Sequence, residues 1–454
     1  MRTLPALVII VVFPACARLT PEQQIVEDAV SALGGRDRVL AVKTLVLDGE
    51  GTQFNLGQDM TPGAATQTFT VSAYRRAIDV ANGRARAGLK RTPGFAYFRG
   101  PAPQQQTADL SPAEGAHHPI AIVRLALDPA TKLDNPRTIG SESVVAMTTA
   151  SGLAFTLAID TTTKLPTRAV SMTDHAVLGD VAIETSFAGY EDVNGLRLPT
   201  RLITKTDDFT TADLRIRTQS VDADLGALAE VAPAPAPAPP AVVVQEVTPG
   251  VWLLGGQSHH SVAVERTDHL LLFEAPSEAR TLAVIAKARE LRPGKPVTHV
   301  VNSHHHFDHS GGIRAAVSEG LTVMTHGANA AFFRDLVGRS RTIAPDALTR
   351  NPQPLEIETV DDELILKDET RPVHLYHIVG SPHGDALLMA YLPRERLLIQ
   401  ADAFGAGNTF NPYAANLLEN IRKRNLRVDR MVSVHGPVAP FAELVKAAQA
   451  TTTN

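Results

Sequence analysis

A run of alternating proline and alanine divides this chain of 454 residues into two halves. The run, APAPAPAPPA, extends from Ala232 to Ala241. Proline fixes φ and has no N–H to donate, so this alternation favours an extended, polyproline-like spacer over helix or sheet. About two hundred residues remain on each side, which is an ordinary domain size. We therefore predict a linker over residues 229–242, one domain over 20–228 and a second over 243–450.

The overall composition bounds the class of partner. With 44% hydrophobic and 20% charged residues, the chain has the balance of a globular protein. Its net charge of −5 gives no reason to expect a nucleic-acid partner, because proteins that bind nucleic acid carry concentrated basic surfaces. We expect a small-molecule substrate instead.

The first residues have the pattern of a secretory signal. Arg2 precedes the apolar run Leu4 to Phe13, and the small residues of PACA follow. A positive start, a short apolar stretch and a small-residue cleavage site predict a signal peptide over residues 1–17. We therefore expect the protein to be exported, either free in the periplasm or anchored to the membrane.

Cys16 is the only cysteine and leaves two processing routes open. Residues 15–17 fit ordinary signal cleavage, whereas Cys16 itself would carry the lipid of a bacterial lipoprotein. Residues 13–15 match a lipoprotein signal poorly, but a lone cysteine at this place favours lipidation. On either route the mature chain has no disulfide and no thiolate for a metal.

The N-terminal half reads as a β-rich domain with helices. Thr20 is a candidate N-cap for a helix over Pro21 to Leu33, and segments of alternating apolar and polar residues follow, punctuated by Gly, Asn and Asp. We predict an antiparallel sheet and find no catalytic group of residues in this half. The pair His117 and His118 precedes a short helix over 120–127, and we interpret it as a capping loop.

Two phrases in this half, TKLPTR and VNGLRLPTR, carry a family resemblance. With the strand rhythm, they resemble the lipoprotein-localisation-factor family. That resemblance implies a curved antiparallel sheet which, with helices, encloses an apolar cavity.

The C-terminal half alternates apolar strands with amphipathic segments. Continuous apolar strands such as THVV and RLLIQAD predict sheets covered by helices. The periodicity predicts helices over residues 277–291, 312–319, 328–336, 412–427 and 440–449.

The stretch VNSHHHFDHSGG, residues 301–312, is a candidate metal-binding loop at the C-terminal end of a strand, where ligands bind in covered sheets. His304 and His306 are two residues apart, so their side chains point to the same side of an extended segment. Asp308 and His309 follow where the chain turns toward a helix. His305 points away on this geometry, and we expect it to be a bystander.

Three later residues supply further candidate ligands. His383 lies in the loop SPHGD, Asp402 ends the strand LLIQAD, and His435 ends the strand MVSVH. Imidazole nitrogens and carboxylate oxygens are the usual ligands of zinc and related divalent ions.

The order H-x-H-x-D-H, then His, then Asp after an apolar strand, then His-Gly, resembles the metallo-β-lactamase superfamily over residues 245–445. The resemblance implies an αββα sandwich with two metal ions at one edge. It implies that the first metal is bound by His304, His306 and His383, and the second by Asp308, His309 and His435, with Asp402 as the bridging carboxylate.

The resemblance predicts a hydrolase, with Asp308 orienting the attacking hydroxide. Two zinc ions would lower the pKa of a bound water to about 7, and the ligand set leaves iron and manganese open. Because β-lactamases of the superfamily usually carry Cys or Ser at the position of Asp402, we favour a small ester, thioester, lactone or amide substrate. The alternatives are a β-lactamase, an iron-dependent oxygenase, and a lipoprotein that binds an apolar ligand.

Other residues near the site are assigned milder roles. His259 and His260 lie in an early hairpin that often overhangs the metals in the resembled family. That position would let one of them touch substrate, but we favour an ordinary loop. Glu274 stands where many relatives carry Asp, and His326 is expected to cap the following helix.

Overall fold

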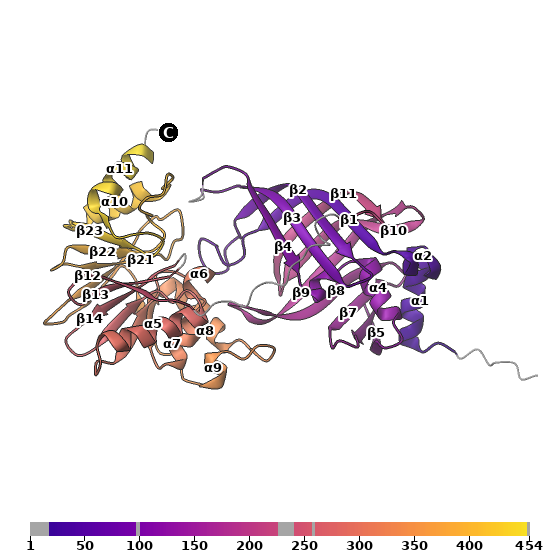
Figure 1. Cartoon of the computed structure of the whole chain (residues 1–454), viewed down its shortest axis with the longest axis horizontal. Helices are drawn as coiled ribbons and strands as arrows, with labels where there is room; N and C mark the ends of the chain where they lie inside the picture. The colour runs from indigo at the N-terminus through magenta and orange to yellow at the C-terminus, as the bar shows by residue number, and fades with distance from the viewer. Residues whose placement is uncertain (1–17, 97–99, 226–239, 257–258, 452–454) are drawn as a thin grey trace, which may run out of the picture.

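The computed structural model describes residues 18–96, 100–225, 240–256 and 259–451 (Figure 1). The predicted signal peptide and most of the predicted linker lie outside the described residues. Within the described part of the chain, no helix is long and apolar enough to cross a membrane.

The N-terminal half forms one large antiparallel sheet, as predicted. Its strands follow one another in the order β4-β3-β2-β1-β11-β10-β9-β8-β7-β6-β5. The strands are β1 (Thr44–Phe54), β2 (Thr68–Asp79), β3 (Arg84–Pro93), β4 (Gln104–Leu110), β5 (Lys132–Ile139), β6 (Glu142–Thr148), β7 (Ala154–Asp160), β8 (Pro166–His175), β9 (Gly179–Val193), β10 (Leu196–Thr206) and β11 (Phe209–Val221).

Helices pack on this sheet and share its apolar core. The predicted first helix is confirmed: Thr20 caps it in a reciprocal capping box with Gln23. Core residues of the sheet, such as Leu45 and Leu157, pack with Val30 of the first helix and Ile122 of the fourth. The helices are α1 (Pro21–Leu33), α2 (Arg36–Ala41), α3 (Pro112–Gly115) and α4 (Pro119–Leu127).

The predicted capping loop before α4 is also confirmed. The His118 ring accepts a hydrogen bond from the Ile120 backbone N–H. His117 does more than the sequence indicates, since its buried ring bridges Thr185 Oγ1 and Ser171 Oγ at 3.0 Å each. The histidine pair therefore ties the start of α4 to strands β8 and β9.

The C-terminal half contains two further sheets, of seven and six strands. In the first, neighbours are antiparallel up to β15 and parallel from there on; in the second, β22 and β23 are parallel. The first comprises β12 (Val243–Thr248), β13 (Val251–Gly255), β14 (Ser261–Glu265), β15 (Leu270–Phe273), β16 (Val297–Val301), β17 (Thr322–His326) and β18 (Ile357–Val360). The second comprises β19 (Glu363–Leu366), β20 (Val373–His377), β21 (Leu388–Leu392), β22 (Leu397–Gln400), β23 (Arg430–Ser433) and β24 (Ala439–Pro440).

The two sheets pack on each other through one face and on helices through the opposite face. On β15, Leu271 belongs to the cluster shared by the two sheets, whereas its neighbours Leu270 and Leu272 pack toward the helices. This two-residue alternation follows from the geometry of a strand buried on both faces. The helices are α5 (Glu278–Leu291), α6 (Phe307–Ser310), α7 (Ile313–Ser318), η2 (Gly327–Asn329), α8 (Ala330–Gly338), α9 (Ala347–Arg350), α10 (Ala414–Lys423) and α11 (Phe441–Thr451).

The helix predicted over 412–427 is shorter at both ends. It ends at Lys423 because Asn425 adopts φ +53, a left-handed conformation that terminates helices. His326 accepts a hydrogen bond from the Ala328 backbone N–H, which confirms its predicted capping role.

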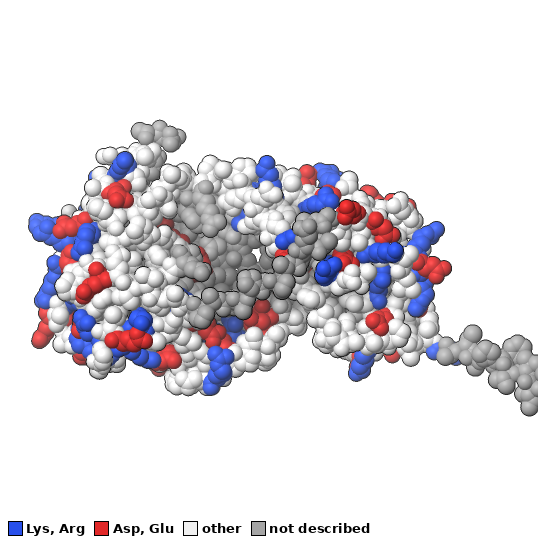
Figure 2. Space-filling view, in the orientation of Figure 1, with Lys and Arg blue, Asp and Glu red and all other residues white. Residues whose placement is uncertain are grey.

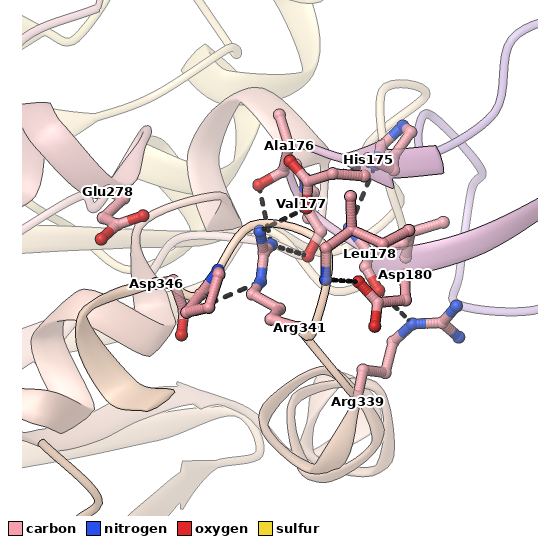
Figure 3. Close-up of polar contacts among 12 residues, drawn as sticks. His175, Ala176, Val177, Leu178, Asp180, Glu278, Arg339, Arg341 and Asp346 are labelled. Atoms are coloured by element: carbon pink, nitrogen blue, oxygen red, sulfur yellow. Dashed lines mark hydrogen bonds and ion pairs between the residues drawn. The ribbon is translucent and has the colours of Figure 1, made fainter. Parts of the chain in front are cut away.

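The two halves are joined by a polar contact between the β8–β9 hairpin and the segment after α8 (Figure 3). The Arg341 guanidinium donates to the carbonyl oxygens of Ala176 and Val177 at 2.8 and 2.7 Å, and lies 3.2 Å from the Asp346 carboxylate. Asp180 of the hairpin accepts from the Thr342 backbone N–H at 2.7 Å. Because Val177 also joins an apolar cluster of the C-terminal half, this contact holds the two halves in a defined relation.

Charged side chains of both signs are interspersed over both halves on the face that Figure 2 shows. Among the described residues, this face therefore shows no concentrated basic patch of the kind that binds a polyanionic ligand.

Candidate metal centre

The histidine-rich loop, residues 302–312, follows β16 and is held by hydrogen bonds within the loop. The Asn302 side chain donates to the His309 carbonyl oxygen at 2.7 Å, and the Ser310 hydroxyl donates to the His305 carbonyl oxygen at 2.9 Å. Asp308 and His309 lie within the short helix α6, which the sequence pattern did not predict. This helical turn redirects them away from the line set by the preceding histidines.

The structure brings His304, His306, His383 and Asp402 into one group. One candidate ligand atom from each lies within 4.8 Å of the others. The Nδ1 atom of His304 is 2.8 Å from the Ser303 hydroxyl, while its Nε2 atom faces His383 Nε2 at 3.1 Å. All three imidazoles are buried. The resemblance implied His304, His306 and His383 around the first metal, with Asp402 as the bridging carboxylate.

A second group contains Asp308, His309 and His435, as predicted, and also His259. His309 and His435 face each other with their Nε2 atoms 3.1 Å apart. His259 Nε2 lies 3.1 Å from Asp308 Oδ2. For His259 the sequence favours only an ordinary loop, because spacing along the chain cannot show that the hairpin folds over the histidine-rich loop.

Asp402 lies between the two groups. Its Oδ2 atom is 2.9 Å from His383 Nε2, and its Oδ1 atom is 2.9 Å from His435 Nε2 and 3.0 Å from His309 Nε2. The strand ends earlier than predicted, so Asp402 and His435 each lie two residues beyond β22 and β23. Because those strands are parallel neighbours, both side chains emerge at the same sheet edge.

Burial and mutual charge determine the protonation of the site. Burial, together with neighbouring imidazoles, holds the pKa of His304 and His306 well below the ordinary value of 6.5. Burial opposes the ionisation of Asp402, but His309, His435 and His383 outweigh it and hold the carboxyl pKa well below its usual range. Burial likewise opposes a charge on His309, yet Asp402, Asp308 and Glu274 raise its pKa well above 6.5.

The donor set fits divalent cations. In each group two imidazole Nε2 atoms lie 3.1 Å apart, and a carboxylate lies beside them. A proton between the two nitrogens can form one hydrogen bond, but it cannot satisfy the other atoms that converge there. The Nδ1 atoms of His304 and His309 are held by a hydroxyl and a carboxylate, which orients both rings. Neutral imidazole nitrogens and ionised carboxylates that converge in this way are the ligands zinc prefers.

His305 takes no part in either group. Its buried ring packs edge-on against Phe332, with centroids 5.7 Å apart, and burial lowers its pKa to about 4. This position agrees with the expectation that His305 is a bystander.

A cavity of about 1010 Å³ opens beside the two groups. Asp308, Asp402 and His435 reach its wall from the C-terminal half, where Phe404 and Tyr413 add aromatic surface. Asn55, Leu56 and Gln58 line it from the N-terminal half. Sequence reasoning missed this contribution, because no metal-ligand spacing marks those residues.

The arrangement of the site agrees with a comparison against protein families. The model for the Metallo-beta-lactamase superfamily matches residues 254–435. The C-terminal half contains a metallo-beta-lactamase superfamily domain. The matched range is narrower than the predicted 245–445, but it includes all seven predicted ligands and His259. No curated protein matched the chain.

Several solved structures are similar to a part of this chain. A metallo-beta-lactamase from Pontibacter korlensis is 17% identical, with 47% of this chain and 100% of that chain covered and a TM-score of 0.37. The metallo-beta-lactamase FIM-1 from Pseudomonas aeruginosa, in a mono-zinc form, is 17% identical. The match covers 47% of this chain and 95% of that chain, with a TM-score of 0.36. A metallo-beta-lactamase from Hirschia baltica is 18% identical, with 46% of this chain and 97% of that chain covered and a TM-score of 0.35.

Proposed function

We propose that this protein is a dinuclear zinc hydrolase whose metallo-beta-lactamase domain is an αββα sandwich. The observation that carries the proposal is the position of Asp402, with one oxygen beside each group of histidines. A single carboxylate that faces two sets of imidazoles is suited to bridge two cations. The first metal would be held by His304, His306 and His383, and the second by Asp308, His309 and His435.

Zinc ions bound there would act as Lewis acids and lower the pKa of a coordinated water to about 7. The chain's own contribution is to bring imidazole nitrogens and ionised carboxylates together in two groups that would hold these ions. Burial opposes ionisation of Asp308, but His309 and His259 outweigh it and hold the carboxyl pKa below its usual range. An ionised Asp308 can accept a hydrogen bond from the attacking water and orient it toward a carbonyl carbon.

The cavity supports a small carbonyl substrate. It is large enough for a drug-sized molecule and combines the aromatic surface of Phe404 and Tyr413 with the amide of Asn408. We therefore infer a small ester, thioester, lactone or amide. β-Lactams belong to the same chemical class and are one arm of the test.

A hydrolysis panel of lactones, thioesters, simple amides and β-lactams tests this function, with zinc content measured on the same preparations. We expect turnover of at least one class, and a loss of about a hundredfold or more in Asp308→Ala. Full activity in Asp308→Ala, or zinc well below one equivalent after loading, would contradict the proposal. Dioxygen uptake with bound iron would point to the oxygenase alternative, and lipid that co-purifies with an inactive protein to the binding alternative.

We further propose that the protein is exported and that Cys16 carries a lipid anchor. The apolar run before Cys16 and the absence of any other cysteine support this. Mass spectrometry of the mature N-terminus would show a diacylated cysteine. An unmodified N-terminus at residue 18 would contradict lipidation while leaving export intact.

A further inference from the structure

A segment of the N-terminal half crosses the metal centre. The segment, residues 55–60, lies between β1 and β2 and is called the strap here. Its Gly57 carbonyl oxygen accepts from the Phe307 backbone N–H at 3.1 Å, within the histidine-rich loop. Its Met60 carbonyl oxygen accepts from the Asp385 backbone N–H at 2.8 Å, in the loop that carries His383. In Figure 1 the strap reaches from the large sheet toward α6.

The strap determines which nitrogen of His306 carries a proton. His306 Nε2 lies 2.9 Å from the Asp59 carbonyl oxygen. A carbonyl oxygen only accepts, so Nε2 must donate and the neutral ring keeps its lone pair on Nδ1. Nδ1 is buried and has no hydrogen-bond partner within the described chain. A neutral ring with this tautomer offers Nδ1 as the metal-binding atom.

The strap also holds one oxygen of Asp308. The Gln58 carboxamide donates to Asp308 Oδ1 at 2.8 Å. The other oxygen, Oδ2, lies 3.1 Å from His259 Nε2 and 3.7 Å from His309 Nε2, inside the second group. The two carboxylate oxygens of Asp308 therefore have different partners. Oδ1 is held by the Gln58 amide of the strap, and Oδ2 points toward the second group.

We propose that the strap belongs to the metal centre and helps it to bind metal. The Asp59 carbonyl sets the tautomer of His306, and Gln58 is a positioning residue for Asp308. The metallo-beta-lactamase domain would then depend on the N-terminal domain for full metal affinity. This proposal rests on the proposed function for the chemical use of the metals, whereas its test relies on metal binding alone.

Gly57 provides a way to displace the strap. It has φ +77, and a Cβ atom added there would lie 2.3 Å from the Phe307 ring. The Phe307 ring packs edge-on against the ring of His175 in the β8–β9 hairpin, with centroids 5.4 Å apart, so a shift of Phe307 would disturb that contact too. Gly63, in the same connection, has φ +82 but nothing within 4 Å of an added Cβ. Gly63→Ala therefore carries the same backbone strain without the collision.

The first experiment compares Gly57→Ala and Gly63→Ala in the full chain. Zinc affinity is measured by competition with a chromophoric chelator, and folding by circular dichroism. We expect Gly57→Ala to lower zinc affinity about ten- to a hundredfold, because the hydrogen bond that orients His306 is lost. Equal affinities in two folded variants would overturn the role of the Asp59 carbonyl.

The second experiment replaces the Gln58 carboxamide without altering the strap backbone. Gln58→Met keeps the length of the side chain but removes the donor to Asp308. Its matched control is Gln24→Met, which removes a 2.7 Å carboxamide bond to Asp28 on the exposed side of α1. We expect Gln58→Met to weaken only the second of two cobalt-binding steps, about tenfold, and to change the cobalt spectrum of that step. Unchanged binding in both steps would overturn the positioning role of Gln58.

The two proposals fail in different ways. If the wild type binds two metal ions but hydrolyses nothing in the panel, the proposed function fails and the affinity differences still decide the role of the strap. If the wild type is active and the strap variants bind metal like their controls, the strap proposal fails alone. A wild type that binds no divalent ion overturns both.

Discussion

The carboxylate of Glu274 holds the imidazole of His309, with Oε2 2.9 Å from Nδ1. Its second oxygen, Oε1, accepts from the Ser303 backbone N–H at 3.0 Å, so one side chain ties β15 to the histidine-rich loop. Glu274 follows β15 directly and has φ +69, an uncommon conformation for a residue other than glycine. Since β15 and β16 are parallel neighbours, Glu274 and Ser303 emerge at the same edge.

Replacing this carboxylate should weaken the second metal position. In Glu274→Gln the shape is kept, but the negative charge that orients and polarises the His309 ring is lost. We expect about tenfold lower affinity in the second zinc-binding step and little change in the first. Chelator competition measures both steps, with Glu290→Gln, on the exposed surface of α5, as the control. A uniform loss in both steps would instead indicate a general structural defect.

Asp402 and Asp308 should differ in their effect on metal content. Asp402 faces both groups, whereas Asp308 belongs to the second alone. We expect Asp308→Asn to retain about one zinc ion per chain and Asp402→Asn to retain clearly less. Atomic emission after gel filtration gives the number directly. If Asp402→Asn kept both ions, Asp402 would not be the bridging ligand.

His259 should contribute to the second position. Its Nε2 atom lies 3.1 Å from Asp308 Oδ2, and its ring centroid lies 4.4 Å from that of His435. We expect His259→Asn to lower the affinity of the second cobalt-binding step by about tenfold and to change its spectrum. His374→Asn, on β20, is the control. Identical spectra for His259→Asn and the wild type would reduce His259 to a loop residue.

Stability should fall in acid because of His117. Burial, with a smaller effect from the Arg76 charge, lowers its pKa to about 3 from the ordinary 6.5. The unfolded chain therefore binds the extra proton between these values, and stability decreases as the pH falls from about 6.5 toward 3. The loss reaches about 2 kcal/mol at pH 5 for this group.

Urea unfolding of the zinc-loaded protein at pH 7.5 and pH 5, followed by circular dichroism, measures this loss. His117→Asn removes the titrating ring, so its stability should depend less on pH than that of the wild type, although it is lower at pH 7.5. His374→Asn serves as the control variant again. An equal dependence on pH in His117→Asn and the wild type would exclude His117 as the cause.

Features that depend on residues close together in the chain, such as helix caps, could be predicted from the sequence alone. Thr20 caps α1 and His326 caps η2, since each acts on a backbone N–H two or three residues away. His304 and His306 share a side because of strand periodicity. The candidate ligands His383, Asp402 and His435 are recognised from their order along the chain and their places in a loop or at predicted strand ends. The boundaries were less exact, as α6 and the early ends of β22 and β23 show.

The sequence by itself determined the candidate ligands and the division between a β-rich half and an alternating half, because residue type and short-range period are local properties. The division of those ligands between two metals came from the resemblance to the metallo-β-lactamase superfamily. Only the tertiary structure decided that Gln58 meets Asp308 across 250 residues, and that Asp59 meets His306. Those contacts depend on how the β8–β9 hairpin packs against Arg341 and on how the strap packs against Phe307. No period or spacing along the chain encodes such packing, since it arises from the shapes of two folded surfaces.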